Sequence, residues 1–359
     1  MLPRIYQKRY RTGFCVGILL FAAALRLAAA PSLTEKLWQT LRRFAGSEGL
    51  FRFVMLSQSG MSVESGSISA TVEAPARDTA QETRPAPTET ETPTDTQPQE
   101  TEQVQISLPE FTQQEAQAIA IRGNCTYTVD KTALLTAPLC WRTPSQGPQV
   151  LIIHTHTSEA YTPSEGYEYT ASGNYRTQQA DRSVVAVGDA LAECLEENGI
   201  SVLHDTQLHD YPSYNDSYAS SKTAIEEYLN QYPSIVMVVD VHRDAAENAD
   251  GTQVRQTAQI GGQTCAALML VVGTDEGGLY HPYWQENLSC ALKLQALLNR
   301  EYPGLCRDLS LRAERFNQHE TPASLLVEVG STGNTLPEAL TAAQYLGDTL
   351  AELLLANME

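Results

Sequence analysis

The chain lacks the sequence patterns of several common protein classes. Its seven cysteines form no C-x-x-C pair, which argues against the usual cysteine-based zinc sites. No H-E-x-x-H motif is present, which argues against a zinc protease of that type. Acidic residues outnumber basic ones by 43 to 24, for a formal net charge of −19, and no dense basic patch interrupts them. Such a balance argues against nucleic acid as the main partner.

Residues 64–102 have almost no aliphatic side chains after Val72 and are rich in Thr, Pro, Gln, Ala and Ser. Nine acidic and two basic residues lie in this stretch. Such a segment buries too little apolar surface to offset the conformational entropy lost on folding. We therefore predict a disordered acidic linker over residues 61–103.

The N-terminus has the pattern of a membrane anchor. Four basic residues within the first 11 precede an apolar run at residues 13–30, which Arg26 alone interrupts. This order places the N-terminus in the cytoplasm. We predict a cytoplasmic tip and single-pass transmembrane anchor over residues 1–30, a juxtamembrane segment over 31–60, and an extracytoplasmic remainder. Residues 28–30 also resemble a signal-peptidase site, so cleavage stays open, although Pro31 disfavours it.

Short apolar segments alternate with amphipathic ones from residue 148 to residue 359. This alternation, with strands apolar on both faces, predicts one α/β domain with a mostly parallel central sheet flanked by helices. A small β-rich lead-in is expected at 104–147, where Cys125 and Cys140 flank a predicted hairpin and either pair or stay free. Candidate strands are 149–154, 200–204, 234–241, 266–273 and 324–329, and candidate helices are 180–197, 217–231, 284–301 and 336–355.

Ionisable side chains follow three candidate strands at the point where each strand ends. His154, His156 and Glu159 follow the first strand, His242 follows the third, and Glu328 ends the last. The carboxyl ends of strands in an open α/β sheet form its binding sites, so these groups should converge. Imidazole and carboxylate are the usual ligands of hydrolytic zinc. We predict His156 and His242 as ligands, His154 as a buried alternative, and Glu159 as either a ligand or an orienting partner.

Glu328 lies within the apolar string Leu325-Leu326-Val327-Glu328-Val329. Burial of a carboxyl group raises its pKa, which suits a general acid and base near neutral pH. We predict a catalytic role for Glu328. The competing interpretation is a structural ion pair with Arg312 or Arg315.

Polar residues beside the predicted ligands are further candidates. Arg243 and Asp244 either hold a histidine or clamp a substrate carboxylate, and the competing interpretation is an ion pair between the two. Asn334 is suited to stabilising its loop or to binding substrate. We predict Arg243 as a catalytic residue and Asp244 and Asn334 as substrate contacts.

The chain resembles the stage II sporulation protein P family in strings that occur in order. These are HTHTSEAYTP, HDYPSYNDSYASS, PSIVMVVDVHRDA, HPYWQENL, YPGL, RFNQ and LLVEVGSTGNT. The resemblance covers about residues 104–356. It implies a membrane-anchored zinc hydrolase, related to N-acetylmuramoyl-L-alanine amidases, that acts on peptidoglycan at the engulfment septum during sporulation. It also implies cleavage of peptide cross-links and two partners, stage II sporulation proteins D and M.

The resemblance maps His156 and His242 onto the two metal histidines and Glu328 onto the catalytic glutamate. Gln179 stands where an acidic ligand is expected, and glutamine is a poor zinc ligand. We expect Glu159 to supply the third ligand. The alternatives are Asp181 in a shifted register, or a chain that binds the metal only weakly. The rival functions are a peptidoglycan-binding scaffold that does not cut, and a zinc peptidase acting on proteins.

Overall fold

The computed structural model describes residues 107–358. The predicted anchor, juxtamembrane segment and acidic linker lie outside these residues. Across residues 107–358, no helix is both long enough and apolar enough to cross a membrane.

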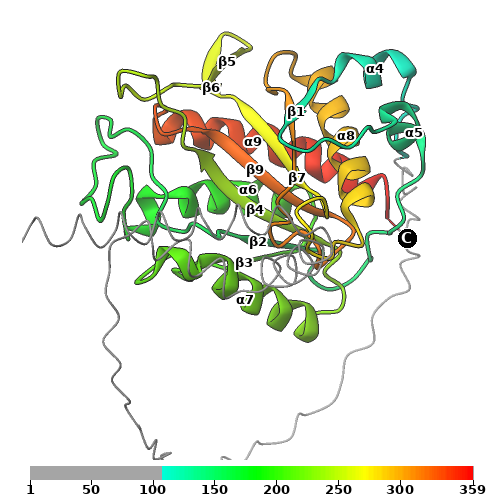
Figure 1. Cartoon of the computed structure of the whole chain (residues 1–359), viewed down its shortest axis with the longest axis horizontal. Helices are drawn as coiled ribbons and strands as arrows, with labels where there is room; N and C mark the ends of the chain where they lie inside the picture. The colour runs from blue at the N-terminus through cyan, green and yellow to red at the C-terminus, as the bar shows by residue number, and fades with distance from the viewer. Residues whose placement is uncertain (1–106, 359) are drawn as a thin grey trace, which may run out of the picture. The chain divides into compact units, whose positions relative to one another are not determined.

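Seven strands of the described chain form a central sheet in the order β1-β8-β7-β9-β4-β2-β3 (Figure 1). Neighbouring strands run parallel except β7 and β9, which are antiparallel, so the sheet is mixed. The predicted α/β sheet flanked by helices is confirmed. The strands are β1 (Ile121–Gly123), β8 (Leu309–Arg312), β7 (Leu268–Gly273), β9 (Ser324–Ser331), β4 (Met237–Asp244), β2 (Val150–Ile153) and β3 (Val202–His204). An antiparallel hairpin of β5 (Thr257–Ile260) and β6 (Gln263–Ala266) stands apart from the sheet.

The helices cover both faces of the sheet, as the apolar strands require. Alternate residues of β2 point to opposite layers. Val150 and Ile152 join the large core built with α6, α8 and α9, whereas Leu151 and Ile153 join a smaller core under α7. The helices are α4 (Gln113–Ala118), α5 (Lys131–Thr136), α6 (Val184–Glu197), α7 (Ser217–Gln231), α8 (Trp284–Glu301) and α9 (Leu336–Leu355), with one-turn 3₁₀ helices η1 (Ala180–Arg182) and η2 (Tyr214–Asp216).

The segment before the main domain differs from the prediction. Residues 107–147 contain α4, α5 and the short strand β1, so the expectation of a β-rich lead-in is wrong. Thr112 and Glu115 close the first turn of α4 with a capping box, which is a local helix-start signal. β1 pairs with β8 and so belongs to the main sheet. Cys125 and Cys140 are both free thiols.

The register between β4 and β9 positions the candidate site. Val241 lies opposite Val327, and His242 lies opposite Glu328. The register then shifts between His242 and Asp244, which marks a β-bulge at this point. Bulges re-aim side chains and are common beside active sites.

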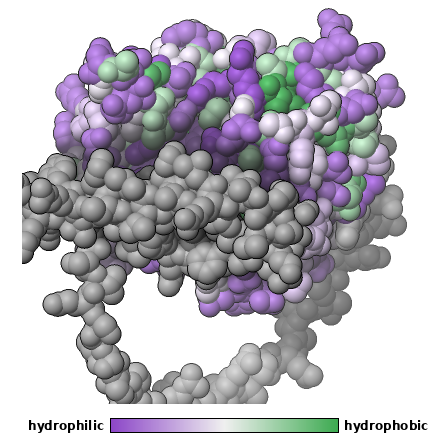
Figure 2. All heavy atoms as spheres, viewed as in Figure 1, coloured by the Kyte–Doolittle hydropathy of each residue, from purple (hydrophilic) through white to green (hydrophobic). Residues whose placement is uncertain are grey.

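On the face shown in Figure 2, the surface outside the grey atoms is mostly hydrophilic, with only small hydrophobic patches.

Candidate active site

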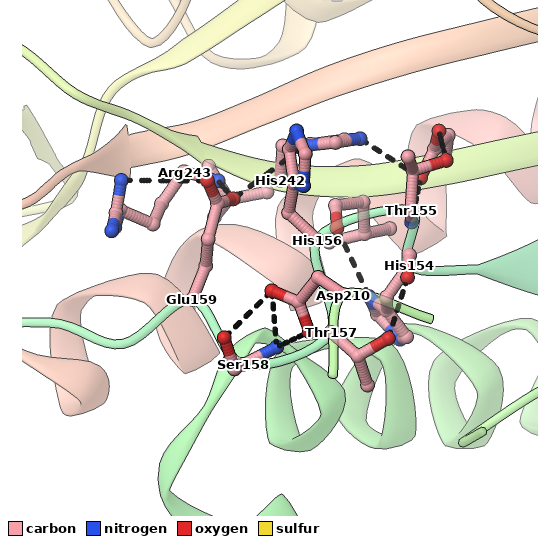
Figure 3. A network of polar contacts seen from close by, with 12 residues as sticks. His154, Thr155, His156, Thr157, Ser158, Glu159, Asp210, His242 and Arg243 are labelled. Atoms are coloured by element: carbon pink, nitrogen blue, oxygen red, sulfur yellow. Dashed lines mark hydrogen bonds and ion pairs between the residues drawn. The ribbon is translucent and has the colours of Figure 1, made fainter. Parts of the chain in front are cut away.

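His242 lies between two buried carboxylates. Its Nδ1 is 3.5 Å from Oε2 of Glu159 (Figure 3). Its Nε2 is 2.9 Å from Oδ1 of Asp240, with which it forms an ion pair without a hydrogen bond. Burial alone lowers the pKa of His242, but the two carboxylates outweigh burial and raise that pKa well above its ordinary value. The two carboxylates therefore favour the protonated form of His242.

Asp240 is fixed by Thr155. The backbone N–H of Thr155 donates to Oδ1 at 2.8 Å and its hydroxyl donates to Oδ2 at 2.6 Å. Burial raises the pKa of Asp240, but His242 and the bonds from Thr155 outweigh it and hold that pKa below the usual range. Asp240 thus stays ionised and orients one nitrogen of His242, which leaves the other nitrogen facing Glu159.

Glu159 is held by arginines from two segments. The backbone N–H of Arg243 donates to Oε2 at 3.2 Å, and the guanidinium groups of Arg243 and Arg176 each lie 3.5 Å from Oε1. Burial raises the pKa of Glu159, but Arg243 and His242 outweigh it and keep that pKa far below its ordinary value. Glu159 is therefore a carboxylate at neutral pH, pointing at His242.

His156 completes the set of candidate ligands. Its ring centre lies 5.4 Å from that of His242, at an interplanar angle of 87°. Tyr214 stacks on the ring at 4.5 Å, with its hydroxyl 3.3 Å from Nε2. The Nδ1 atom is buried and has no hydrogen-bond partner. Burial lowers the pKa of His156 to about 4, so the ring is neutral at pH 7 and can offer a lone pair.

Glu328 lies opposite His242 on the neighbouring strand. Its Oε2 is buried without a hydrogen-bond partner. Burial raises the pKa of Glu328 to about 8, and the nearby carboxylate of Glu159 adds to the effect. The alternative of a structural ion pair is not realised, because Arg312 bonds to Glu314 and Asn124, and Arg315 donates to a backbone carbonyl.

Two predicted residues lie elsewhere. His154 turns away from the site: its Nδ1 contacts Val241 O at 3.0 Å and its Nε2 contacts Nε2 of His204 at 2.8 Å. β2 ends at Ile153, so His154 and His156 both lie beyond the strand and do not share one of its faces. Asn334 is buried and fully bonded to Ser331, Gln256 and Glu338, which corrects its prediction as a substrate contact.

Arg243 and Asp244 do not pair with each other. Asp244 pairs with Arg307 at 2.8 Å, so no bond ties it to the site. Arg243 is 4% exposed and donates to the carbonyls of Ala160 and Tyr175 at 3.0 Å each, besides holding Glu159. These bonds make Arg243 a positioning residue and correct the prediction that it is catalytic.

The two alternatives to Glu159 face solvent or other partners. The Oε1 atom of Gln179 accepts from the backbone N–H of Thr170 at 2.6 Å. The side chain of Asp181 is 71% exposed and pairs with Arg182. Neither side chain is placed with His156 or His242, whereas Glu159 is.

Three residues beside the site, Arg176, Asp210 and Tyr214, were not predicted. The guanidinium of Arg176 lies 4.6 Å from the ring centre of Tyr214 and bonds to Asp210 at 2.7 Å. Asp210 also accepts from the hydroxyl of Ser158 at 2.6 Å. The string HDYPSYNDSYASS contains Asp210 and Tyr214, and its density of aromatic and acidic residues was the available signal.

The donor atoms fit a zinc ion in chemistry, although they are not gathered around one point. Across residues 107–358, no three His, Cys, Asp or Glu side chains lie close enough together to hold a metal. The 3.5 Å between His242 Nδ1 and Glu159 Oε2 nevertheless matches two ligand atoms on one tetrahedral zinc, about 3.3 Å apart. The unpaired Nδ1 of His156 supplies a further donor. The protonated form of His242 carries a proton on Nδ1, which faces Glu159. A metal bound at Nδ1 would displace this proton.

Comparisons with known proteins give one family and several distant folds. A model of the stage II sporulation protein P (SpoIIP) family matches residues 54–351. None of the curated proteins matches the chain. An N-acetylmuramoyl-L-alanine amidase of Nostoc punctiforme is 12% identical, at a TM-score of 0.34, over 59% of this chain and 97% of its own.

Two further solved structures are similar at the same level. An N-acetylmuramyl-L-alanine amidase of Mycobacterium abscessus is 12% identical, at a TM-score of 0.34, over 58% of this chain and 98% of its own. The catalytic domain of the CD27L endolysin targeting Clostridia difficile is 11% identical, at a TM-score of 0.34, over 59% of this chain and 99% of its own.

Proposed function

Because the chain belongs to the stage II sporulation protein P family, we propose that it is a membrane-anchored, zinc-dependent peptidoglycan hydrolase of sporulation. It cleaves the amide between N-acetylmuramic acid and L-alanine at the engulfment septum. One observation supports this function above the others. His242 Nδ1 and Glu159 Oε2 stand at ligand spacing, and the unpaired carboxyl of Glu328 lies on the neighbouring strand opposite His242.

His156, His242 and Glu159 would hold the metal. When bound, zinc acts as a Lewis acid that polarises the scissile carbonyl and favours attack by water. Asp240 would orient His242 so that Nδ1 faces the metal, and Arg243 and Arg176 hold Glu159. The carboxylate of Glu159 is thus held in place by its protein neighbours.

Glu328 moves the proton. Its carboxylate accepts a proton from the attacking water as the water oxygen bonds to the lactyl carbonyl carbon. The same proton then passes to the nitrogen of L-alanine as the C–N bond breaks, which yields a carboxylic acid and a free amine. Burial raises the pKa of Glu328 towards neutrality. A carboxyl group with such a pKa can both take up a proton and release it near neutral pH.

The test uses the full chain on cell-wall sacculi. Glu328→Gln keeps the shape of the side chain but cannot take up the proton, so release of stem peptides should fall by about 10²–10⁴-fold. The matched control is Glu314→Gln, in a surface ion pair with Arg312, which should release peptides at the parent rate. Equal rates for Glu328→Gln and the parent would refute the mechanism.

Chelation and product analysis separate the rival functions. Removal of zinc should stop release, and added zinc should restore it. New amino termini of L-alanine identify the amidase reaction, whereas split cross-links identify the endopeptidase reaction that the family resemblance also implies. Tight binding to sacculi with neither product would indicate a non-cutting scaffold. The implied partners, stage II sporulation proteins D and M, are tested by whether they raise the rate.

A further inference from the structure

Buried polar atoms without a hydrogen-bond partner gather in two places. Among the described residues ten such side-chain atoms occur, and three of them belong to the candidate active site. Four others belong to just three residues: both ring nitrogens of His281, Nε of Arg315 and Nδ1 of His319. Unpaired buried polar groups are costly and call for an explanation. The proposed active site accounts for the first group, through the metal ligands, the proton carrier and the ion pair of His242 with Asp240, and leaves the second unexplained.

The second cluster lies at the other end of the sheet from Glu328. β7 ends at Gly273 and β8 at Arg312, and the loops that follow them run side by side (Figure 1). A bond of 3.0 Å from Nη1 of Arg315 to the carbonyl of Tyr280 ties the two loops together. The backbone N–H of Gly273 donates to Gln318 at 2.6 Å, which fixes the second loop to the sheet. The cluster therefore rests on a rigid support.

The chemistry of the cluster favours an anion. A guanidinium group donates hydrogen bonds and accepts none, so a ligand at Arg315 Nε must be an acceptor. The rings of His281 and His319 lie 6.4 Å apart at 76°, and His281 is 2% exposed. A positive charge at Arg315 disfavours a metal cation there. The nearby carboxylate of Glu320 is already engaged by His319 at 2.8 Å.

The charge and the surroundings favour a singly charged organic anion. Burial, then the neighbouring His319 and Arg315, lower the pKa of His281 to about 4, so its ring is neutral at pH 7. One guanidinium charge matches a carboxylate better than a phosphate dianion. Leu279 and Tyr280, the two residues directly before His281, are 53% and 78% exposed. They provide an apolar rim on which the body of a ligand can rest.

We propose that His281, Arg315 and His319 form a second binding site for a carboxylate of the peptidoglycan stem peptide, remote from Glu328. The identity of the ligand rests on the proposed function, whereas the site itself rests on the unpaired polar atoms of these three side chains. Such a site would hold the wall at a second point while a bond is cut at the first.

Nuclear magnetic resonance of the histidine rings tests the site in the full chain. The probe is N-acetyl-D-alanyl-D-alanine, with its C-terminal amide as the uncharged match. The carboxylate should shift the ring resonances of His281 and His319 in a saturable way, and the amide should not. Arg315→Gln should weaken binding at least about tenfold. The control Arg312→Gln, on a side chain that is 40% exposed, should bind within about twofold of the parent.

Several results would overturn the site. These are no shift with the carboxylate, equal shifts with the amide, or unchanged affinity in Arg315→Gln. Shifts with inorganic phosphate or zinc alone would replace the carboxylate by that ligand. If Arg315→Gln does not fold, Arg315→Lys is the second variant, because lysine keeps the positive charge but lacks the planar guanidinium group. Unweakened binding in Arg315→Lys would exclude recognition by the guanidinium group. The ring resonances do not depend on hydrolysis, so an inactive chain that binds the probe refutes only the proposed function.

Discussion

Replacing Asp240 by asparagine separates the charge of this residue from its hydrogen bonds. The amide oxygen of asparagine can still accept from the backbone N–H of Thr155, as Oδ1 does at 2.8 Å. The amide nitrogen can donate to the hydroxyl of Thr155, which is free to donate onward to Ser221 at 2.8 Å. The substitution therefore keeps the network and removes the negative charge 2.9 Å from His242 Nε2.

The expected loss is in zinc affinity. Removal of an outer carboxylate that orients a metal-binding histidine weakens binding about 10–100-fold, which is about 1.4–2.7 kcal/mol at 25 °C. Competition with a chelator measures the affinity, and circular dichroism establishes that the variant is folded. The control Ser221→Ala cuts the same network one bond further out and leaves the charge, so it should stay within about threefold.

Two outcomes would refute this reasoning. Affinity of Asp240→Asn within threefold of the parent would show that the charge does not position His242. An equal loss in Ser221→Ala would show that the network matters as a whole, and that the ion pair has no special part in it.

Two other predictions concern stability. In Gly188→Ala the new Cβ would lie 2.5 Å from His154 Nε2 and 2.6 Å from His204 Nε2, so the free energy of unfolding, measured in urea, should fall by about 1–3 kcal/mol. The control is Gly173→Ala, whose new Cβ would make ordinary contacts at 3.6 Å. An equal loss of stability in Gly173→Ala would count against the steric argument. Because burial lowers the pKa of His281 to about 4, the unfolded chain takes up its proton first as the pH falls below 6.5. In carboxylate-free buffer the free energy of unfolding should therefore drop by about 2 kcal/mol more between pH 7 and pH 5 in the parent than in His281→Gln, and the same pH dependence in both chains would contradict this.

The larger elements were predictable because their signals are local. The helix bounds 217–231, 284–301 and 336–355 agree with α7, α8 and α9, since apolar periodicity and flanking polar residues act within each segment. β8 has only four residues and β1 three, too short for a pattern to stand out. The antiparallel pairing of β7 with β9 also left no sequence signal, because partner choice depends on residues far apart in the chain.

The sequence by itself determined the alternation of apolar strands and amphipathic helices, and it placed His156, His242 and Glu328 at or beside strand ends. The family strings added the class of chemistry. Only the tertiary structure decided which neighbours these residues meet. It turned His154 towards His204, enclosed Asn334 in its own loop, and set Asp240 and Glu159 on opposite sides of His242. The reason is physical: ion pairs and burial depend on distances between segments, and those distances exist only once the sheet is assembled.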